Sequence, residues 1–166
     1  LFVNIVLDYV ERVISNGDLN GILDVKPLRI FLLGTAGTGK TRAVRTALQE
    51  IYRLLDRHGL PVTFVRCAAP TGTAAFNMRF NATTLHRLIQ WLNLRHFDEI
   101  RTDKILIPLQ QHPQHTQLIF LDEVSMIGRT MMGRVDSRLR QGKATDETLG
   151  GVGCVCGGDP AQCEAM

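Results

Sequence analysis

The chain alternates between short runs of apolar residues and longer amphipathic stretches. Near-continuous apolar runs that predict strands occupy residues 28–33, 62–67, 118–121 and 152–156. Such runs are typical of strands buried within a parallel sheet. Apolar residues at helical spacing fill residues 1–15, 41–58, 84–94 and 127–141. Strands that alternate with helices predict an α/β fold with a mostly parallel sheet and helices on both faces.

Each predicted helix has one apolar stripe. Residues 41–58 carry Val44, Leu48, Ile51 and Leu55 on one face, and Gly59 and Pro61 end the helix. The stripe of residues 1–15 consists of Val3, Leu7, Val10 and Ile14, and that of residues 84–94 of Leu85, Leu88, Ile89 and Leu92. Shorter helices are expected at residues 71–77, after Pro70, and at 105–110.

Composition narrows the class of protein. The 166 residues suffice for about one domain, and 45% hydrophobic with 21% charged residues is ordinary globular usage. No apolar run approaches the roughly 18 residues of a membrane span, so no membrane segment is predicted. The net charge of +3 is compatible with a nucleic-acid partner but too small to imply one.

The four cysteines do not form a disulfide scaffold, which favours a reducing, intracellular compartment. Cys67 falls inside an apolar run and is expected to be buried. Cys154, Cys156 and Cys163 form a C-x-C-x6-C pattern without a nearby histidine. Structural zinc sites use four ligands, usually in C-x2–4-C pairs, so this spacing argues against zinc.

A glycine-rich loop follows the first predicted strand and matches G-x4-G-K-[ST] in full. Its residues are Gly34, Thr35, Ala36, Gly37, Thr38, Gly39, Lys40 and Thr41. Glycines let such a loop wrap a phosphate, and the N-terminus of the following helix adds partial positive charge. Lys40 would reach the β- and γ-phosphates, and the Thr41 hydroxyl would bind Mg²⁺. A plain glycine-rich turn with a surface lysine is the weaker interpretation.

Two carboxylates end the predicted strand at 118–121. Asp122 would hold the Mg²⁺ shell, and Glu123 would act as general base for an attacking water. A kinase has less need of a water-activating glutamate, so the pair favours hydrolysis. Because strands of a parallel sheet end at one edge, we expect this pair, the phosphate loop and residues 70–75 to face the same side.

Three further segments carry polar groups at that edge. Thr71, Gly72 and Thr73 would either cap the helix at 71–77 or bind a nucleic-acid phosphate. His86, at the start of the next helix, is either a surface residue or a strand contact. Asp159 and Gln162 follow the last predicted strand. Trp91 is expected in the core, with a base-stacking platform as the alternative. Arg129, Arg134, Arg138 and Arg140 are expected on a solvated helix face, with binding to a nucleic-acid backbone as the alternative.

Together these motifs resemble the PIF-type DNA helicases, a RecD-related branch of helicase superfamily one. The matching stretches are GTAGTGKT (34–41), APTGTAAFNM (69–78), TTLH (83–86), LIFLDEVSMIG (118–128) and GDPAQ (158–162). The resemblance implies a RecA-like P-loop NTPase fold and an ATP-dependent motor that moves 5′ to 3′ on single-stranded DNA. It also implies action in DNA repair and recombination, a monomer, and a location in the nucleus or mitochondrion.

The resemblance also assigns roles to residues. Lys40 and Thr41 match the ATP-phosphate and Mg²⁺ residues, Asp122 and Glu123 the Mg²⁺ and water-activating acids, and Gln162 the glutamine that senses the γ-phosphate. Thr71, Gly72, Thr73 and His86 match positions along the DNA. The chain departs from the family at Asn81, where glycine is common, and at residues 163–166, where the family usually has Leu-Pro-Pro-Val. The glutamine by which the family recognises adenine has no counterpart before Gln49.

The expected domain is the first of the two RecA-like domains of such a helicase, over residues 1–166 and truncated at both ends. The second domain would be a partner that supplies an arginine finger, worth roughly 10³–10⁵ in rate, so this chain alone is expected to turn over slowly. Two alternatives stay open. One is another P-loop NTPase such as a small-molecule kinase, and the other is a non-catalytic remnant that binds nucleotide or DNA.

Overall fold

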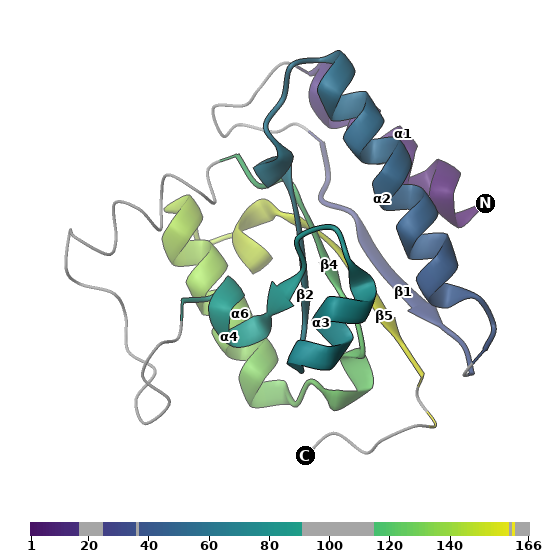
Figure 1. Ribbon diagram of the computed structural model, residues 1–166. Helices are drawn as coiled ribbons and strands as arrows, with labels where there is room; N and C mark the ends of the chain where they lie inside the picture. The colour runs from purple at the N-terminus through teal and green to yellow at the C-terminus, as the bar shows by residue number, and fades with distance from the viewer. Residues whose placement is uncertain (17–24, 36, 91–114, 160, 162–166) are drawn as a thin grey trace.

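The computed structural model describes residues 1–16, 25–35, 37–90, 115–159 and 161, and these residues form a single parallel sheet flanked by helices. Five strands lie in the order β1-β5-β4-β2-β3, and every neighbouring pair is parallel (Figure 1). The strands are β1 (Arg29–Leu33), β2 (Val65–Ala69), β3 (Thr83–Thr84), β4 (Leu118–Leu121) and β5 (Gly153–Gly158). The predicted α/β class is therefore confirmed.

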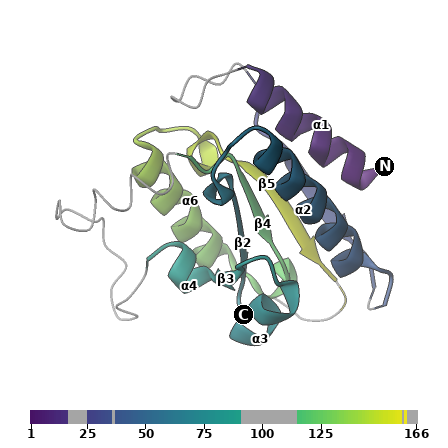
Figure 2. The ribbon, with the colours of Figure 1, turned by 45° about the horizontal axis from the view of Figure 1, so that its top comes forward.

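Helices cover both faces of the sheet, as expected. Helices α1 (Phe2–Ser15) and α2 (Lys40–Arg57) lie together on one side, and α6 (Arg129–Lys143) lies on the other (Figure 2). The remaining helices are short: α3 (Gly72–Met78) and α4 (Leu85–Leu88), with the 3₁₀ turns η1 (Val62–Phe64), η2 (Val124–Met126) and η3 (Thr148–Gly151). Within the described residues, no helix has the length and apolar character needed to cross a membrane.

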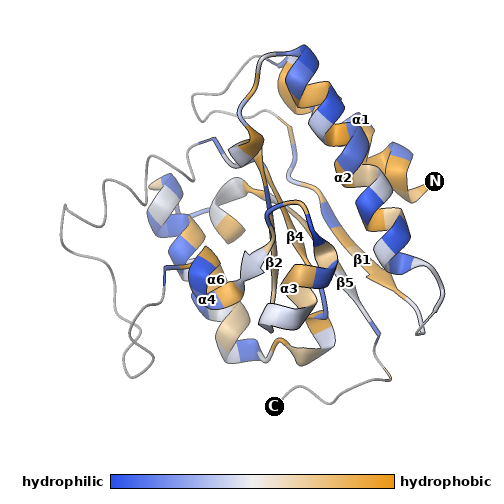
Figure 3. Ribbon diagram, in the orientation of Figure 1, coloured by the Kyte–Doolittle hydropathy of each residue, from blue (hydrophilic) through white to orange (hydrophobic). Residues whose placement is uncertain are grey.

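Two apolar cores hold these layers together. The α1–α2 core packs helix residues such as Val10 and Leu48 against Phe64, Phe120 and Val155. The α6 core joins Val135 and Leu139 to Ile119 and to the cysteines of β5. Figure 3 shows the central strands mostly in hydrophobic colours and polar bands along α2 and α6. Burial of these apolar faces is what drives the layered arrangement.

The stripe of α2 is as predicted, whereas that of α1 is rotated. Val44, Leu48, Ile51 and Leu55 are all buried. In α1 the buried residues are Val6, Tyr9, Val10 and Val13, and the predicted Val3, Leu7 and Ile14 are only half-buried. The Tyr9 hydroxyl donates a hydrogen bond of 3.2 Å to the Gln117 carbonyl, which ties α1 to the start of β4.

Several predicted element bounds were wrong. The 3₁₀ turn η1 occupies residues 62–64, so β2 begins only at Val65. The start of the predicted helix at 84–94 is instead strand β3, and α4 ends at Leu88. β5 extends through Gly158, so the sequence placed Gly157 and Gly158 wrongly in a turn. The predicted helix at 105–110 and Trp91 lie outside the described residues.

Strand β1 is less buried than its apolar sequence predicts. Phe31 is 65% and Leu33 55% exposed, while Ile30 and Leu32 pack against the α1–α2 core. In the described part of the chain β1 pairs only with β5, so it forms an edge of the sheet. The α1–α2 face of this strand is covered, and much of its α6 face is not.

The arginines of α6 are not all solvated, contrary to expectation. Arg138 is only 5% exposed, and its guanidinium donates to Gln141 Oε1 at 2.6 Å. Burial lowers the pKa of Arg138. Arg140 pairs with Asp136 at 2.8 Å. Both of these contacts lie within α6, so they stabilise the helix itself.

Candidate nucleotide and nucleic-acid site

The phosphate loop and the acid pair meet in one cavity. Strands β1, β4 and β5 are neighbours and parallel, so the loops after them emerge at the same edge. The cavity there has a volume of about 370 Å³, and we call it the nucleotide cavity. Its lining residues are Gly37, Thr38, Gly39, Lys40, Thr41, Asp122, Glu123 and Gly158. The predicted convergence of the two motifs is confirmed.

Glycines shape the phosphate loop. Gly37 and Gly39 have φ values of +78° and +86°, a region that residues with a Cβ rarely adopt. A Cβ at Gly34 would lie 2.9 Å from Thr38 Oγ1. Gly39 caps α2, so the loop delivers its backbone directly to the N-terminus of an 18-residue helix. Unpaired N–H groups at such an end favour an anion. Ala36 lies outside the described residues.

Lys40 is held by the loop that it follows. Its Nζ donates to the carbonyl oxygens of Gly34 and of Thr35, the latter at 2.8 Å. Thr38 Oγ1 donates to the same Thr35 oxygen at 2.8 Å. An ammonium has three donors, so Lys40 can add a phosphate oxygen to these two carbonyls.

The acid pair sits on a strained turn. Asp122 follows β4, and its amide donates to the Ala68 carbonyl of β2 at 3.0 Å. Asp122 Oδ1 accepts from the Glu123 amide at 3.0 Å. Glu123 has φ 52° and ψ 44°, in the left-handed region that a glutamate enters at an energetic cost. Both side chains are half-buried at the cavity wall. The strain serves to turn the chain sharply into η2 while both carboxylates stay at the strand end.

Two glycines end β5, where neighbouring atoms leave little room for a Cβ. A Cβ on Gly157 would lie 3.1 Å from Asp122 Oδ1, and one on Gly158 would lie 2.8 Å from Val124 Cγ1. Asp159 is 4% exposed and accepts a hydrogen bond from the Ala161 amide at 3.0 Å. Gln162, the predicted γ-phosphate sensor, lies outside the described residues.

A second polar region lies at the ends of β2 and β3, and we call residues 71–76 and 84–87 the α3–α4 edge. Ala69 of β2 is in register with Thr84 of β3, so α3 and α4 begin side by side. Thr71 Oγ1 accepts from the Ala74 amide at 3.2 Å and so caps α3, while Gly72 and Thr73 are exposed. His86 is half-buried in α4. The structure thus brings together all four predicted DNA-contact residues.

Sequence reasoning passed over three residues near this edge. Phe76 of α3 is 83% exposed, unusual for a large apolar side chain. Arg79 and Arg87 are exposed at the end of α3 and within α4. The available signal was one aromatic residue in the short helix 72–78, whose other apolar residues are Ala74, Ala75 and Met78.

Comparison with known proteins identifies the family. The sequence pattern that defines the AAA domain matches residues 22–163. The chain belongs to the AAA domain family. The ATP-dependent DNA helicase Pif1 of Psychrobacter sp. (strain PRwf-1) is 31% identical over 136 residues, 78% of this chain and 19% of that protein. The ATP-dependent DNA helicase RRM3 of Saccharomyces cerevisiae is 24% identical over 155 residues, 90% of this chain and 19% of that protein.

Solved structures agree with this assignment. Unliganded Pif1 from Bacteroides sp. superimposes with a TM-score of 0.61 and 27% identity, over 91% of this chain and 32% of that chain. Bacteroides sp. Pif1 in complex with ADP-AlF4 gives a TM-score of 0.59 and 28% identity, over the same 91% and 32%. The predicted resemblance to PIF-type helicases and the RecA-like fold are confirmed. This chain spans about a fifth of the length of the curated relatives and about a third of the length of the solved chains.

Proposed function

We propose that this AAA domain is a motor domain of a 5′–3′ DNA helicase, which hydrolyses ATP to ADP and phosphate and couples this step to movement on single-stranded DNA. The observation that carries the proposal is the nucleotide cavity, where the phosphate loop and the acid pair face one another. Relatives named as ATP-dependent DNA helicases, and a similar Pif1 solved with ADP-AlF4, support it.

In the proposed reaction the loop amides and Lys40 bind the β- and γ-phosphates. Glu123 accepts a proton from a water molecule while the water oxygen bonds to the γ-phosphorus and the bond to the ADP oxygen breaks. Mg²⁺ fits the donor set, since the Thr41 hydroxyl and the Asp122 carboxylate line one cavity and are the hard oxygen ligands that this ion prefers. When bound, Mg²⁺ would neutralise phosphate charge.

The proposed DNA track is the α3–α4 edge. Exposed Thr73 and the Gly72 backbone would bind phosphates, together with Arg79 just beyond this edge, and His86 would lie along the strand. Phe76 would stack on a base, because an aromatic face exposed to 83% offers every base a π surface. The second domain of the whole protein would complete both the track and the catalytic centre.

Nucleotide binding is the first test of this proposal. The Lys40→Ala variant should bind MgATP measurably more weakly than wild type in calorimetry. Arg42→Ala, an exposed cation two residues further along α2, should bind like wild type and serves as the matched control. Equal MgATP affinity of wild type and Lys40→Ala would overturn the assignment of the loop.

The rate of ATP hydrolysis, measured with and without single-stranded DNA, then distinguishes the three candidate functions. Stimulation by DNA supports the motor. Phosphate transfer to a small acceptor without any response to DNA would support a kinase instead. Retained binding without turnover, even when the second domain is supplied, would support a non-catalytic remnant.

A further inference from the structure

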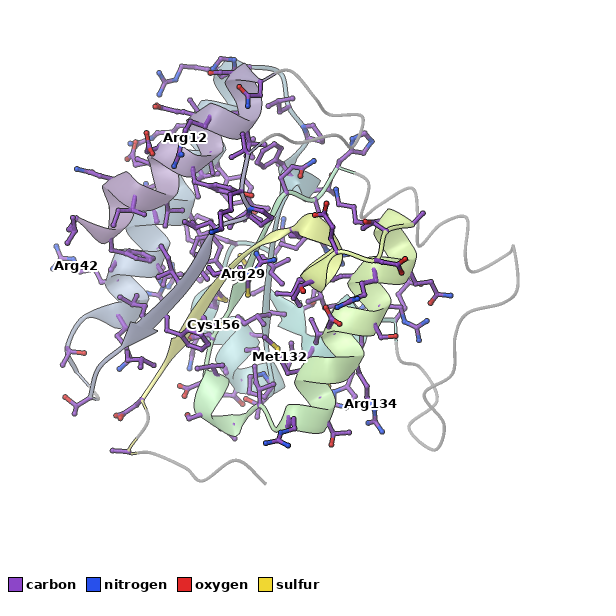
Figure 4. The ribbon with its side chains drawn as sticks, turned by 180° about the vertical axis from the view of Figure 1, so that it is seen from behind. Arg12, Arg29, Arg42, Met132, Arg134 and Cys156 are labelled. Carbon is purple, nitrogen blue, oxygen red and sulfur yellow. The ribbon has the colours of Figure 1, made fainter. Side chains whose placement is uncertain are left out.

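A second cavity lies on the opposite side of β1 from α1 and α2 and has no part in the nucleotide site. Its volume is about 400 Å³. Strands β1 and β5 form its floor, and α6 with η3 forms its wall. Arg29, Phe31, Cys154, Cys156, Met132 and Asp136 are among its lining residues. Figure 4 shows Arg29, Cys156 and Met132 close together between β1 and α6.

The two cysteines are arranged as a chelating pair. They alternate along β5, so both side chains leave the same face of the strand, and their sulfur atoms are 3.6 Å apart. Two thiolates at this separation can both bind one ion at about 2.3 Å, the usual metal–sulfur distance for Zn²⁺, with an S–metal–S angle of roughly 100°. Both residues are 3% exposed, and the cavity gives access to them.

The surrounding donors select a soft ion. Met132 brings a thioether sulfur to the same cavity. The only carboxylate in its lining, Asp136, is already engaged: Oδ1 accepts from the Leu149 amide at 2.6 Å and Oδ2 pairs with Arg140. Among the described residues, no three His, Cys, Asp or Glu side chains gather where they could hold a metal. Thiolate and thioether without oxygen or nitrogen ligands favour monovalent copper over zinc.

The local charges also suit a dithiolate. The Arg29 guanidinium, fixed by hydrogen bonds to the carbonyls of Leu28 at 2.9 Å and Thr148 at 3.0 Å, lies at the floor of the cavity. Arg129 of α6 lines the same cavity and adds a second positive charge beside the sulfur pair.

We propose that Cys154, Cys156 and Met132 form a binding site for Cu(I). Two S–H bonds break, two protons pass to solvent and two Cu–S bonds form, with the thioether as third ligand. Copper stays in the +1 state and no sulfur is oxidised. The complex of Cu(I) with two thiolates carries one negative charge, which Arg29 balances.

The test titrates the 166-residue chain with Cu(I) under anaerobic conditions against the chelator bicinchoninate. Wild type should take up one equivalent, and so should Cys67→Ala/Cys163→Ser, which keeps only the proposed pair. Cys154→Ser/Cys156→Ser should lose at least about 100-fold in affinity, and Met132→Leu, which keeps the shape of the side chain, on the order of tenfold.

X-ray absorption of the copper-loaded wild type needs no variant and should show a first shell of sulfur alone. Circular dichroism and a urea midpoint establish that each variant folds. A shell containing nitrogen or oxygen would overturn the proposal. So would unchanged affinity in a folded Cys154→Ser/Cys156→Ser variant, or loss of binding in Cys67→Ala/Cys163→Ser.

Discussion

The nucleotide cavity and the α3–α4 edge occupy the same edge of one sheet but are built in different ways. At the cavity, glycines at positive φ and a strained Glu123 place backbone amides and carboxylates around the ligand volume, at a cost in local stability. At the α3–α4 edge the polar residues stabilise local structure, since Thr71 and Thr84 cap their own helices.

This difference predicts that substitutions in the two regions have different effects. Substitutions at the cavity should change rates with little effect on folding, because its side chains face the ligand. Substitutions at the α3–α4 edge should affect both stability and DNA affinity, because a hydroxyl that caps a helix has only its remaining lone pair and proton for a phosphate.

The largest effect is expected from Glu123→Gln. Loss of the general base should lower ATP hydrolysis by roughly 10²–10⁴-fold, while MgATP affinity and the urea midpoint stay near wild type. Phosphate release in the presence of DNA and of the second domain measures the rate. Glu11→Gln, an exposed site on α1, is the matched control. Undiminished turnover would remove Glu123 from the mechanism.

Phe76→Ala should weaken binding to single-stranded DNA by about 1–3 kcal/mol, the usual contribution of one stacked base. Fluorescence anisotropy with oligothymidine measures the loss, and the same strand with abasic sites should bind both proteins equally. Phe31→Ala, an equally large exposed side chain at the far edge of the sheet, is the control. A loss that persists on abasic DNA would contradict stacking.

Asn81 tests how the turn into β3 is held. Arg79, Phe80 and Asn81 all have positive φ, and asparagine tolerates this region better than most residues. Asn81→Val should lower the free energy of unfolding by about 1–2 kcal/mol. Asn81→Gly introduces the glycine that is common in PIF-type relatives and should stay within about 0.5 kcal/mol of wild type. Urea denaturation distinguishes the two. Equal losses would show that side-chain contacts, rather than φ, decide the position.

The smallest effect is expected from Thr71→Ala, which removes the cap of α3 at a cost of about 1 kcal/mol. Thermal unfolding should show the loss, and Thr71→Ser should restore it. ATP affinity should not change in either variant. If Thr71→Ala lowered DNA affinity without any loss of stability, the hydroxyl would act on DNA alone.

The sequence predicted the structure best where the local residue pattern and the global fold agree. The stripe of α2 and both cavity motifs were placed correctly, because a long amphipathic helix and a glycine-rich loop after a strand each specify their own geometry. β3 was missed, since two threonines have no apolar signal and are a strand only beside Ala68 and Ala69.

Other features depended on tertiary context. The burial of Arg138 and the exposure of Phe31 follow from where α6 lies across the sheet, which no spacing within either segment reveals. The rotated stripe of α1 follows from its contacts with α2 and with Gln117. The pairing of sulfur atoms across Cys154 and Cys156 needed a strand that places alternate residues on one face.

The strand order has a consequence for synthesis. β1 carries the phosphate loop but meets the described sheet only through β5, with Arg29 beside Cys154. A nascent chain can assemble β2, β3 and β4 first, whereas β1 can join this sheet only after β5 has left the ribosome. At about 5–20 residues per second, several seconds separate the two strands. During that interval the backbone groups of β1 lack their β5 partners, and the nucleotide cavity, which Gly158 of β5 helps to line, is completed only afterwards.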